Sequence, residues 1–293
     1  MNHINRDCLR LERKKYKNSL FHNSVDATYI IHLEGNGRIV SIEEQLKGCQ
    51  PTNTVYIVFN KGYANCKKVL PYEVPARDLV DTFFYIFQDA NEKNYENILI
   101  LEDDFIFTSD IHKENHSRNI NNFLIEKKSE KMMYYLGCLL WLQVPYNSHT
   151  NINLMSSGTH SVIYTYNARL ELMKKKFIPV FDWDIYNNCF SGIRRYVYKQ
   201  PLCYQLFPET ENSKNWPSLF GFDPVKLYIK YNNLDIQLEN GYTNTYIFSK
   251  YLGYLILLTM FIVIFWIFYI LFQYLQIKNG KNKNIYKKIK NKR

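Results

Sequence analysis

One uncharged, apolar segment near the C-terminus constrains the fold of this 293-residue chain more than any other feature. No charged side chain occurs between Tyr251 and Ile277, and the run LGYLILLTMFIVIFWIFYILF is almost wholly apolar. At about 1.5 Å per residue, a helix of this length crosses a hydrocarbon core of about 30 Å. As a buried core helix it would need protein around every face. We therefore expect a transmembrane helix over residues 251–277, in contact with membrane lipid.

The positive charge is concentrated at the two ends of the chain. The formal net charge is +10, but residues 278–293 form a tail with seven lysines, one arginine and no acid, and residues 1–21 form a second basic segment. The chain between them is slightly acidic and lacks the basic surface that contact with a nucleic-acid backbone requires. Nucleic acid is therefore not an expected partner.

Two features of the sequence give conflicting indications of the side of the membrane on which the folded domain lies. A basic tail beside a membrane span favours a cytoplasmic tail, which puts the preceding domain on the opposite side. Residues 1–21, however, lack the apolar run of a signal peptide. On that ground we expect a single-pass protein with a C-terminal anchor and a cytosolic domain. The six cysteines follow no metal-binding spacing, and we expect them to be buried or free thiols.

Residues 22–248 are expected to form one α/β domain. Strand-like runs at 27–33, 54–59 and 97–101 alternate with a short helical segment near 41–46 and a helix over 76–92. Such alternation predicts a Rossmann-like, mostly parallel sheet flanked by helices. Further apolar runs and one more helix follow, at 134–142, 160–166, 167–176 and 195–198.

Three acidic residues follow the third of these strands directly. Glu102, Asp103 and Asp104 come after Asn97–Leu101, an apolar run typical of a strand buried on both faces. Acids in that position need a cation or hydrogen bonds to balance them, and ligands of open α/β sheets bind at the same edge. The i and i+2 spacing puts Glu102 and Asp104 on one side of the strand, where both can reach one Mg²⁺ or Mn²⁺ ion. A solvated acidic turn is the simpler alternative.

The same acidic stretch resembles a site in a known enzyme family. Ile98–Phe105, with the sequence ILILEDDF, resembles the metal-binding strand end of GT-A-fold glycosyltransferases. The likeness is greatest to family 25, the lipopolysaccharide-biosynthesis and procollagen galactosyltransferase group. Tyr29–Leu33, followed by Arg38, is similar to the opening strand of that family.

Three more stretches follow in the order that the family has them. Ser157–His160, before residues 162–168, resembles its Gly-Thr…Tyr…Ala stretch. The acids of Asp182-Trp-Asp184 stand where the family has a further acidic site, and Pro201–Gln205 with Ser213 resembles its Pro…Gln…Ser ending. The resemblance thus runs in fragments over residues 27–216.

This resemblance implies a GT-A-like fold and a metal-dependent glycosyltransferase of the hexosyltransferase type. A sugar would pass from a nucleotide donor, a UDP-sugar, to a hydroxyl acceptor on a protein or glycan. The residues implied as ligands of Mn²⁺ or Mg²⁺ are Glu102, Asp104 and His160, with Asp104 the direct ligand.

Other residues receive roles on the substrates from the same resemblance. Contact with the nucleotide sugar is implied for Arg38, Asp103, Asp104 and Gln205. The guanidinium of Arg38 suits phosphate oxygens in particular. In an inverting reaction, Asp182 or Asp184 would take the acceptor proton as general base.

Two departures from the family pattern leave other functions open. Ala76–Leu79 stands where the family has Gly-Cys-x-x-Ser-His, and His32 replaces an asparagine of the opening strand. A catalytically inactive, glycosyltransferase-like membrane or structural protein is therefore one alternative. A metal-dependent nucleotidyltransferase or phosphohydrolase with the same carboxylates is another, and it would want further acids or histidines around two metals.

Overall fold

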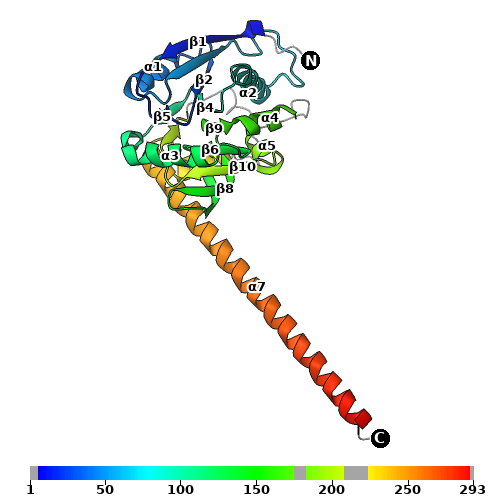
Figure 1. Ribbon diagram of the computed structural model, residues 1–293. Helices are drawn as coiled ribbons and strands as arrows, with labels where there is room; N and C mark the ends of the chain where they lie inside the picture. The colour runs from blue at the N-terminus through cyan, green and yellow to red at the C-terminus, as the bar shows by residue number, and fades with distance from the viewer. Residues whose placement is uncertain (1–5, 175–182, 208–223, 291–293) are drawn as a thin grey trace. The chain divides into compact units, whose positions relative to one another are not determined.

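The computed structural model describes residues 6–174, 183–207 and 224–290. It divides into two units, residues 1–250 and residues 251–293. Within its described residues, the first unit holds a nine-stranded sheet in the order β1-β3-β2-β4-β9-β6-β10-β8-β7 and a small sheet of β5 and β11 (Figure 1). The strands are β1 Leu9–Lys15, β2 Ala27–Leu33, β3 Thr54–Asn60, β4 Asn97–Glu102, β5 Phe105–Phe107, β6 Met132–Tyr135, β7 Leu139–Pro145, β8 Thr150–Ser157, β9 Ser161–Thr165, β10 Arg194–Tyr198 and β11 Cys203–Gln205. The helices are η1 Arg6–Cys8, α1 Ile39–Gly48, α2 Pro75–Glu92, η2 Ser109–His112, α3 Glu114–Glu126, α4 Tyr166–Lys174, α5 Trp183–Cys189, α6 Pro224–Tyr231 and α7 Leu238–Lys290.

Three parallel strands form the part of the sheet that the sequence predicts most directly. β2 lies between β3 and β4, and both of its pairings are parallel. β9 runs antiparallel to both β4 and β6, so β6 has the same direction as β4. The predicted α/β fold with helices around a sheet is confirmed. The predicted run at 134–142 is two strands, β6 and β7, with a turn between them.

Each face of the sheet packs against its own set of helices. Along β4, Ile98 and Ile100 belong to the apolar cluster that contains α2, α4 and α5. The alternate residues Leu99 and Leu101 belong to the cluster that contains α1 and α3. All four side chains are fully buried. A strand covered on both faces explains why its sequence is a continuous apolar run.

The N-terminal basic segment contributes an edge strand to this domain. β1 pairs antiparallel with β3 along its whole length, from Leu9 opposite Asn60 to Lys15 opposite Thr54. Leu9 is buried and Leu11 is half-buried, but the other five residues of the strand are charged, so the sequence LRLERKK reads as a charged segment. The sheet therefore begins before residue 22, where the sequence places the start of the domain.

Helix α7 begins inside the first unit and contains the apolar segment. Its first turns carry Tyr242 and Tyr246, both buried in the core, and the backbone oxygen of Tyr246 accepts a 2.8 Å hydrogen bond from Gln143 Nε2. Among the described residues, α7 is the one helix long and apolar enough to cross a membrane, over Leu238–Gln276. The predicted span of residues 251–277 coincides with its apolar part.

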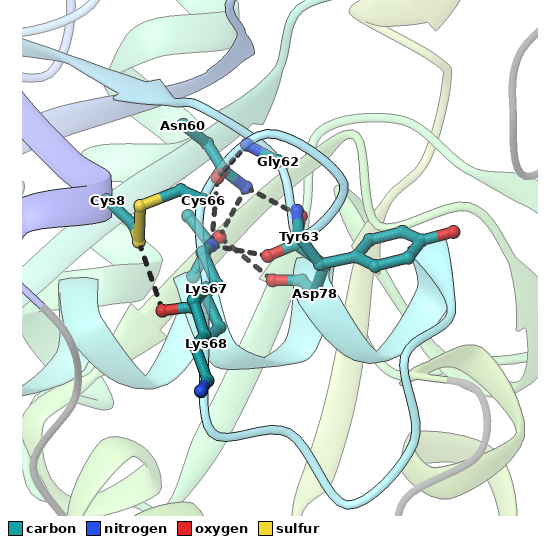
Figure 2. A network of polar contacts seen from close by, with 9 residues as sticks. Cys8, Asn60, Gly62, Tyr63, Cys66, Lys67, Lys68 and Asp78 are labelled. Carbon is teal, nitrogen blue, oxygen red and sulfur yellow. Dashed lines mark hydrogen bonds and ion pairs between the residues drawn. A yellow bond between two sulfur atoms is a disulfide. The ribbon is translucent and has the colours of Figure 1, made fainter.

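A disulfide and a buried ion pair hold the loop that follows β3 (Figure 2). Cys66 in this loop is bonded to Cys8 at the start of β1. Two residues on, the Lys68 ammonium is buried against the Asp78 carboxylate of α2 and donates a 2.8 Å hydrogen bond to Asn60 Oδ1. The expectation of free thiols is therefore wrong for Cys8 and Cys66, because the β1–β3 pairing brings distant cysteines together. Cys49, Cys138, Cys189 and Cys203 are free thiols.

We expect Lys68→Met to lower the free energy of unfolding by about 3–5 kcal/mol, because it leaves the buried Asp78 carboxylate without a counter-charge. Adding Asp78→Asn removes that charge, so the double variant should be more stable than Lys68→Met alone. Chemical denaturation of the full chain in detergent, followed by tryptophan fluorescence, measures both. Equal stability of Lys68→Met and the wild type would contradict the role of the pair.

Candidate functional site

The acidic turn lies where the sheet brings several strand ends together. Leu101 of β4 is paired with Ser161, the first residue of the antiparallel β9. The next residue of β4, Glu102, donates its backbone N–H to the carbonyl of His160 at 3.2 Å. An antiparallel strand therefore places its starting residues at the same edge as the carboxyl ends of β2 and β4.

Asp103 is the structural anchor of the turn. Its Oδ1 accepts a 2.5 Å hydrogen bond from Arg38 Nη1, and its Oδ2 accepts hydrogen bonds from Asn36 Nδ2 at 2.5 Å and the Leu33 N–H at 3.1 Å. His32 Nδ1 lies 3.3 Å from the same oxygen. Burial raises the pKa of this carboxyl, but these donors outweigh burial and hold the pKa below its ordinary value. Asp103 is thus an ionised carboxylate that ties the β2–α1 turn to the end of β4.

Glu102 and Asp104 lack such compensation. Burial, followed by the negative charge of Asp104, raises the pKa of Glu102 to about 8, although Thr159 Oγ1 donates a 2.7 Å hydrogen bond to Glu102 Oε1. Burial and the charge of Asp103 raise the pKa of Asp104 to about 7. Nη1 of Arg38 lies 3.6 Å from Asp104 Oδ2, farther than from Asp103. The site therefore holds more buried negative charge than its own cation balances.

Two buried atoms at the site have no hydrogen-bond partner among the described residues. They are Oδ1 of Asp104 and Nδ1 of His160. The His160 Nε2 lies 3.3 Å from the carbonyl oxygen of Cys203, which can only accept, so Nε2 carries the proton of the neutral ring. Burial lowers the pKa of His160 to about 4, against hydrogen bonds to the Cys203 carbonyl and the Gln205 side chain, so the ring is neutral at pH 7.

Strand β11 brings Gln205 beside the acids. It pairs antiparallel with β5, which places Gln205 opposite Phe105. Gln205 Nε2 donates a 3.2 Å hydrogen bond to Asp104 Oδ2, and its backbone N–H donates to the Tyr242 hydroxyl at 3.1 Å. The short sheet thus delivers a residue from far along the chain to the end of β4.

Asp184 reaches the site from helix α5. The preceding residue, Trp183, is buried against Phe83 of α2 with ring centroids 5.1 Å apart, and it donates to the Tyr164 hydroxyl at 3.2 Å. Asp184 Oδ2 accepts a 2.8 Å hydrogen bond from the N–H of Gly158. Its negative charge contributes to the raised pKa of Glu102, so the two carboxylates lie within electrostatic range.

The structure therefore brings together seven of the residues that the sequence selects. Those present at this edge are Arg38, Glu102, Asp103, Asp104, His160, Asp184 and Gln205. Asp182 and Ser213 lie outside the described residues. Arg38 and Asp103 bind each other, and their roles on a donor stay predictions. Sequence reasoning missed Asn36, and it gave Thr159 no role although Thr159 stands in the Ser157–His160 stretch.

The chemistry of these donors fits a hard divalent cation. Asp104 offers a buried carboxylate oxygen without a partner, and the raised pKa values of Glu102 and Asp104 mark a shortage of positive charge. The predicted set of three ligands, Glu102, Asp104 and His160, is wrong as a set, because no three His, Cys, Asp or Glu side chains in the described parts of the chain are grouped so that they could hold a metal ion. Oxygens from water or a diphosphate would therefore have to complete the coordination shell, as is usual for Mg²⁺ sites.

Comparisons with known proteins give only remote structural likenesses, and two of them follow. No protein-family model and no curated protein matches the chain. A glycosyltransferase involved in the glycosylation of the major capsid of PBCV-1 is similar at a TM-score of 0.38 and 13% identity, covering 65% of this chain and 96% of that chain. A197 from STIV is similar at a TM-score of 0.37 and 12% identity, covering 63% of this chain and 87% of that chain. Neither likeness assigns a family, so the function has to be argued from the site.

Gly137 is expected to be indispensable for the position of β11. A Cβ atom on Gly137 would lie 1.7 Å from the carbonyl oxygen of Cys203, the same oxygen that His160 contacts. We expect Gly137→Ala to cost about 3 kcal/mol or more, because a backbone segment must move. Gly48→Ala is the matched control, since its Cβ meets nothing within 4 Å. Thermal unfolding of both full-length variants tests this, and equal melting temperatures would contradict the close approach.

Proposed function

We propose that the domain transfers a sugar from a nucleoside-diphosphate donor to a hydroxyl acceptor with the help of a divalent cation. The observation that carries the proposal is the buried carboxylate Asp104, with one oxygen unpartnered, beside Glu102 at the carboxyl edge of the sheet. Ligands of α/β sheets bind at this edge. The resemblance of ILILEDDF to glycosyltransferase metal sites points to the same chemistry.

In this proposal the cation is Mn²⁺ or Mg²⁺, and Asp104 is its direct ligand. Glu102 stands beside Asp104 and offers a second carboxylate. When bound, the metal would neutralise charge on the diphosphate of the leaving nucleotide. Gln205 holds the second oxygen of Asp104 through its 3.2 Å hydrogen bond, which fixes the direction of the free oxygen.

The remaining residues divide into donor and acceptor roles. Arg38 is the nearest cation to the acids, and its partly exposed guanidinium can extend to a phosphate oxygen of a UDP-sugar. Asp103 keeps Arg38 at the edge of the sheet. Asp184 would take the proton of the acceptor hydroxyl, because the Gly158 N–H fixes its orientation and its charge acts on Glu102 at the same edge of the sheet.

Removing the metal or its ligand should abolish turnover. We expect release of UDP from a UDP-hexose by the full chain in detergent to stop with EDTA and to return with Mn²⁺. Asp104→Asn should lower the rate about 100-fold or more, because metal stabilisation of the leaving group is worth several kcal/mol. Asp235→Asn, an exposed acid far along the chain, is the matched control. UDP release that persists both in EDTA and in the Asp104→Asn variant would contradict the metal-dependent mechanism.

The same assay separates the alternative functions. A screen of nucleotide sugars and of nucleoside triphosphates identifies the donor class. Turnover of a triphosphate with release of pyrophosphate would indicate a nucleotidyltransferase. If no nucleotide binds to the wild type in the presence of Mn²⁺, the domain is a binding or structural module.

The general-base role of Asp184 requires a different signature. Asp184→Asn keeps an acceptor oxygen for the Gly158 N–H but cannot take a proton. We expect kcat for sugar transfer to fall about 10²–10⁴-fold, while titration calorimetry gives an unchanged Kd for the donor in Mn²⁺. An unchanged kcat would assign the base elsewhere, and a lost donor affinity would make Asp184 a binding residue.

A further inference from the structure

The Cys8–Cys66 disulfide bears on the side of the membrane that the domain occupies. The two cysteines are 58 residues apart in sequence, and their Cα atoms lie 5.7 Å apart, a distance typical of disulfides. Pairing of the β1 and β3 strands sets the position of Cys8, which is fully buried. A turn in which the Cys66 N–H donates to the Gly62 carbonyl at 3.0 Å sets the position of Cys66. The fold therefore holds both sulfurs at bonding distance by its own hydrogen bonds.

The loop around Cys66 is fixed independently of the sulfur atoms. Asp78 Oδ2 accepts the Tyr63 N–H at 3.0 Å, and Lys68 binds both Asp78 and Asn60 (Figure 2). Because buried polar anchors hold the loop on either side of Cys66, the bond joins two segments that are already ordered. Such a bond is a structural disulfide, and these persist in oxidising compartments and are rare in the cytosol.

The basic tail gives an independent indication of the same orientation. Residues 278–293 carry seven lysines and one arginine without an acid, directly after the apolar segment. Lysine and arginine within about 15–20 residues of a span favour the cytoplasmic side. A cytoplasmic tail on a single-pass protein places the domain that precedes the span on the opposite side.

A third feature is a sequon on the surface of the domain. Asn115-His116-Ser117 has the Asn-x-Ser pattern of N-glycosylation acceptors. Asn115 is exposed in the first turn of α3, whereas the neighbouring His116 is buried and hydrogen-bonded to Tyr198 at 2.7 Å. The acceptor amide is therefore on the side of the helix that faces solvent.

We propose that the α/β domain lies in the lumen of the secretory pathway, with the Cys8–Cys66 disulfide formed and Asn115 N-glycosylated there, and that residues 278–293 remain in the cytosol. This reverses the orientation favoured by residues 1–21 alone. Disulfide formation removes two protons and two electrons from the thiols of Cys8 and Cys66. A protein disulfide donor of the compartment accepts them by exchange and becomes a dithiol. The inference does not depend on the activity of the domain.

The thiol state is tested on the full chain made in eukaryotic cells. Free thiols are blocked with N-ethylmaleimide in denaturant, disulfides are then reduced, and newly exposed thiols are labelled with maleimide-PEG. We expect a gain of two PEG groups in the wild type and none in the Cys8→Ser/Cys66→Ser variant. No gain in the wild type, or a gain that persists in the double variant, would overturn the assignment of this disulfide.

The orientation is tested on the same chain in sealed microsomes, with an epitope after Arg293. Added protease should remove the epitope and leave the domain intact. Digestion of the domain with protection of the epitope would overturn the proposed orientation, even if the disulfide is present, because an oxidant outside the secretory lumen would then have formed it.

Glycosylation is tested by the mass that an endoglycosidase removes. We expect the loss of one glycan from the wild type and none from Asn115→Gln or Ser117→Ala, which remove the sequon in two ways. Asn119→Gln on the same helix is the control and should keep the glycan. A wild type that the endoglycosidase does not change would overturn the assignment of Asn115.

Discussion

The ion pair between Arg38 and Asp103 is the interaction on which the candidate site depends. It is a 2.5 Å charge-assisted contact, and the Asn36 side chain and the Leu33 N–H add two more hydrogen bonds to the same carboxylate. Together they close the turn after β2 over the end of β4. Because this positive charge is engaged by Asp103, little of it remains for Glu102 and Asp104. The ion pair therefore has two consequences: it fixes Asp103 in place, and it leaves the negative charge of Glu102 and Asp104 largely unbalanced.

Residues distant in sequence complete the site through two strand pairings that the predicted parallel sheet does not contain. β9 begins where β4 ends, so the residues just before it, Thr159 and His160, lie at this edge, while β11 pairs with β5 and supplies Gln205. The absence of a side chain at Gly137 lets the Cys203 carbonyl approach and accept from His160. The backbone pairing of these strands therefore fixes the positions and directions of the buried hydrogen-bond donors and acceptors of the candidate site.

The sequence predicts the strands that are buried on both faces, because each is a continuous apolar run: β2, β3 and β4 appear within one residue of the expected ranges. It predicts α2 for a similar reason, since one apolar face repeats at helical spacing. It does not reveal β1, in which five of the seven residues are charged, or β11, which is too short for a periodic pattern. The sequence predicts the position of Glu102, Asp103 and Asp104 because they directly follow a strand. The partners of Asp103 and the pairing of Cys8 with Cys66 follow from tertiary contacts that no spacing encodes.

The proposed membrane anchor and the proposed chemistry of the site constrain each other. A transferase on an anchored domain meets only acceptors that are presented on its own side of the membrane. If that side is the lumen, the acceptor hydroxyls are those of secretory proteins and glycans, and the nucleotide sugar has to be available in the same compartment. The pKa values of Glu102 and Asp104, about 8 and about 7, bear on the same point. Near neutral pH a cation must displace protons to bind this pair, so metal loading is expected to weaken in an acidic compartment.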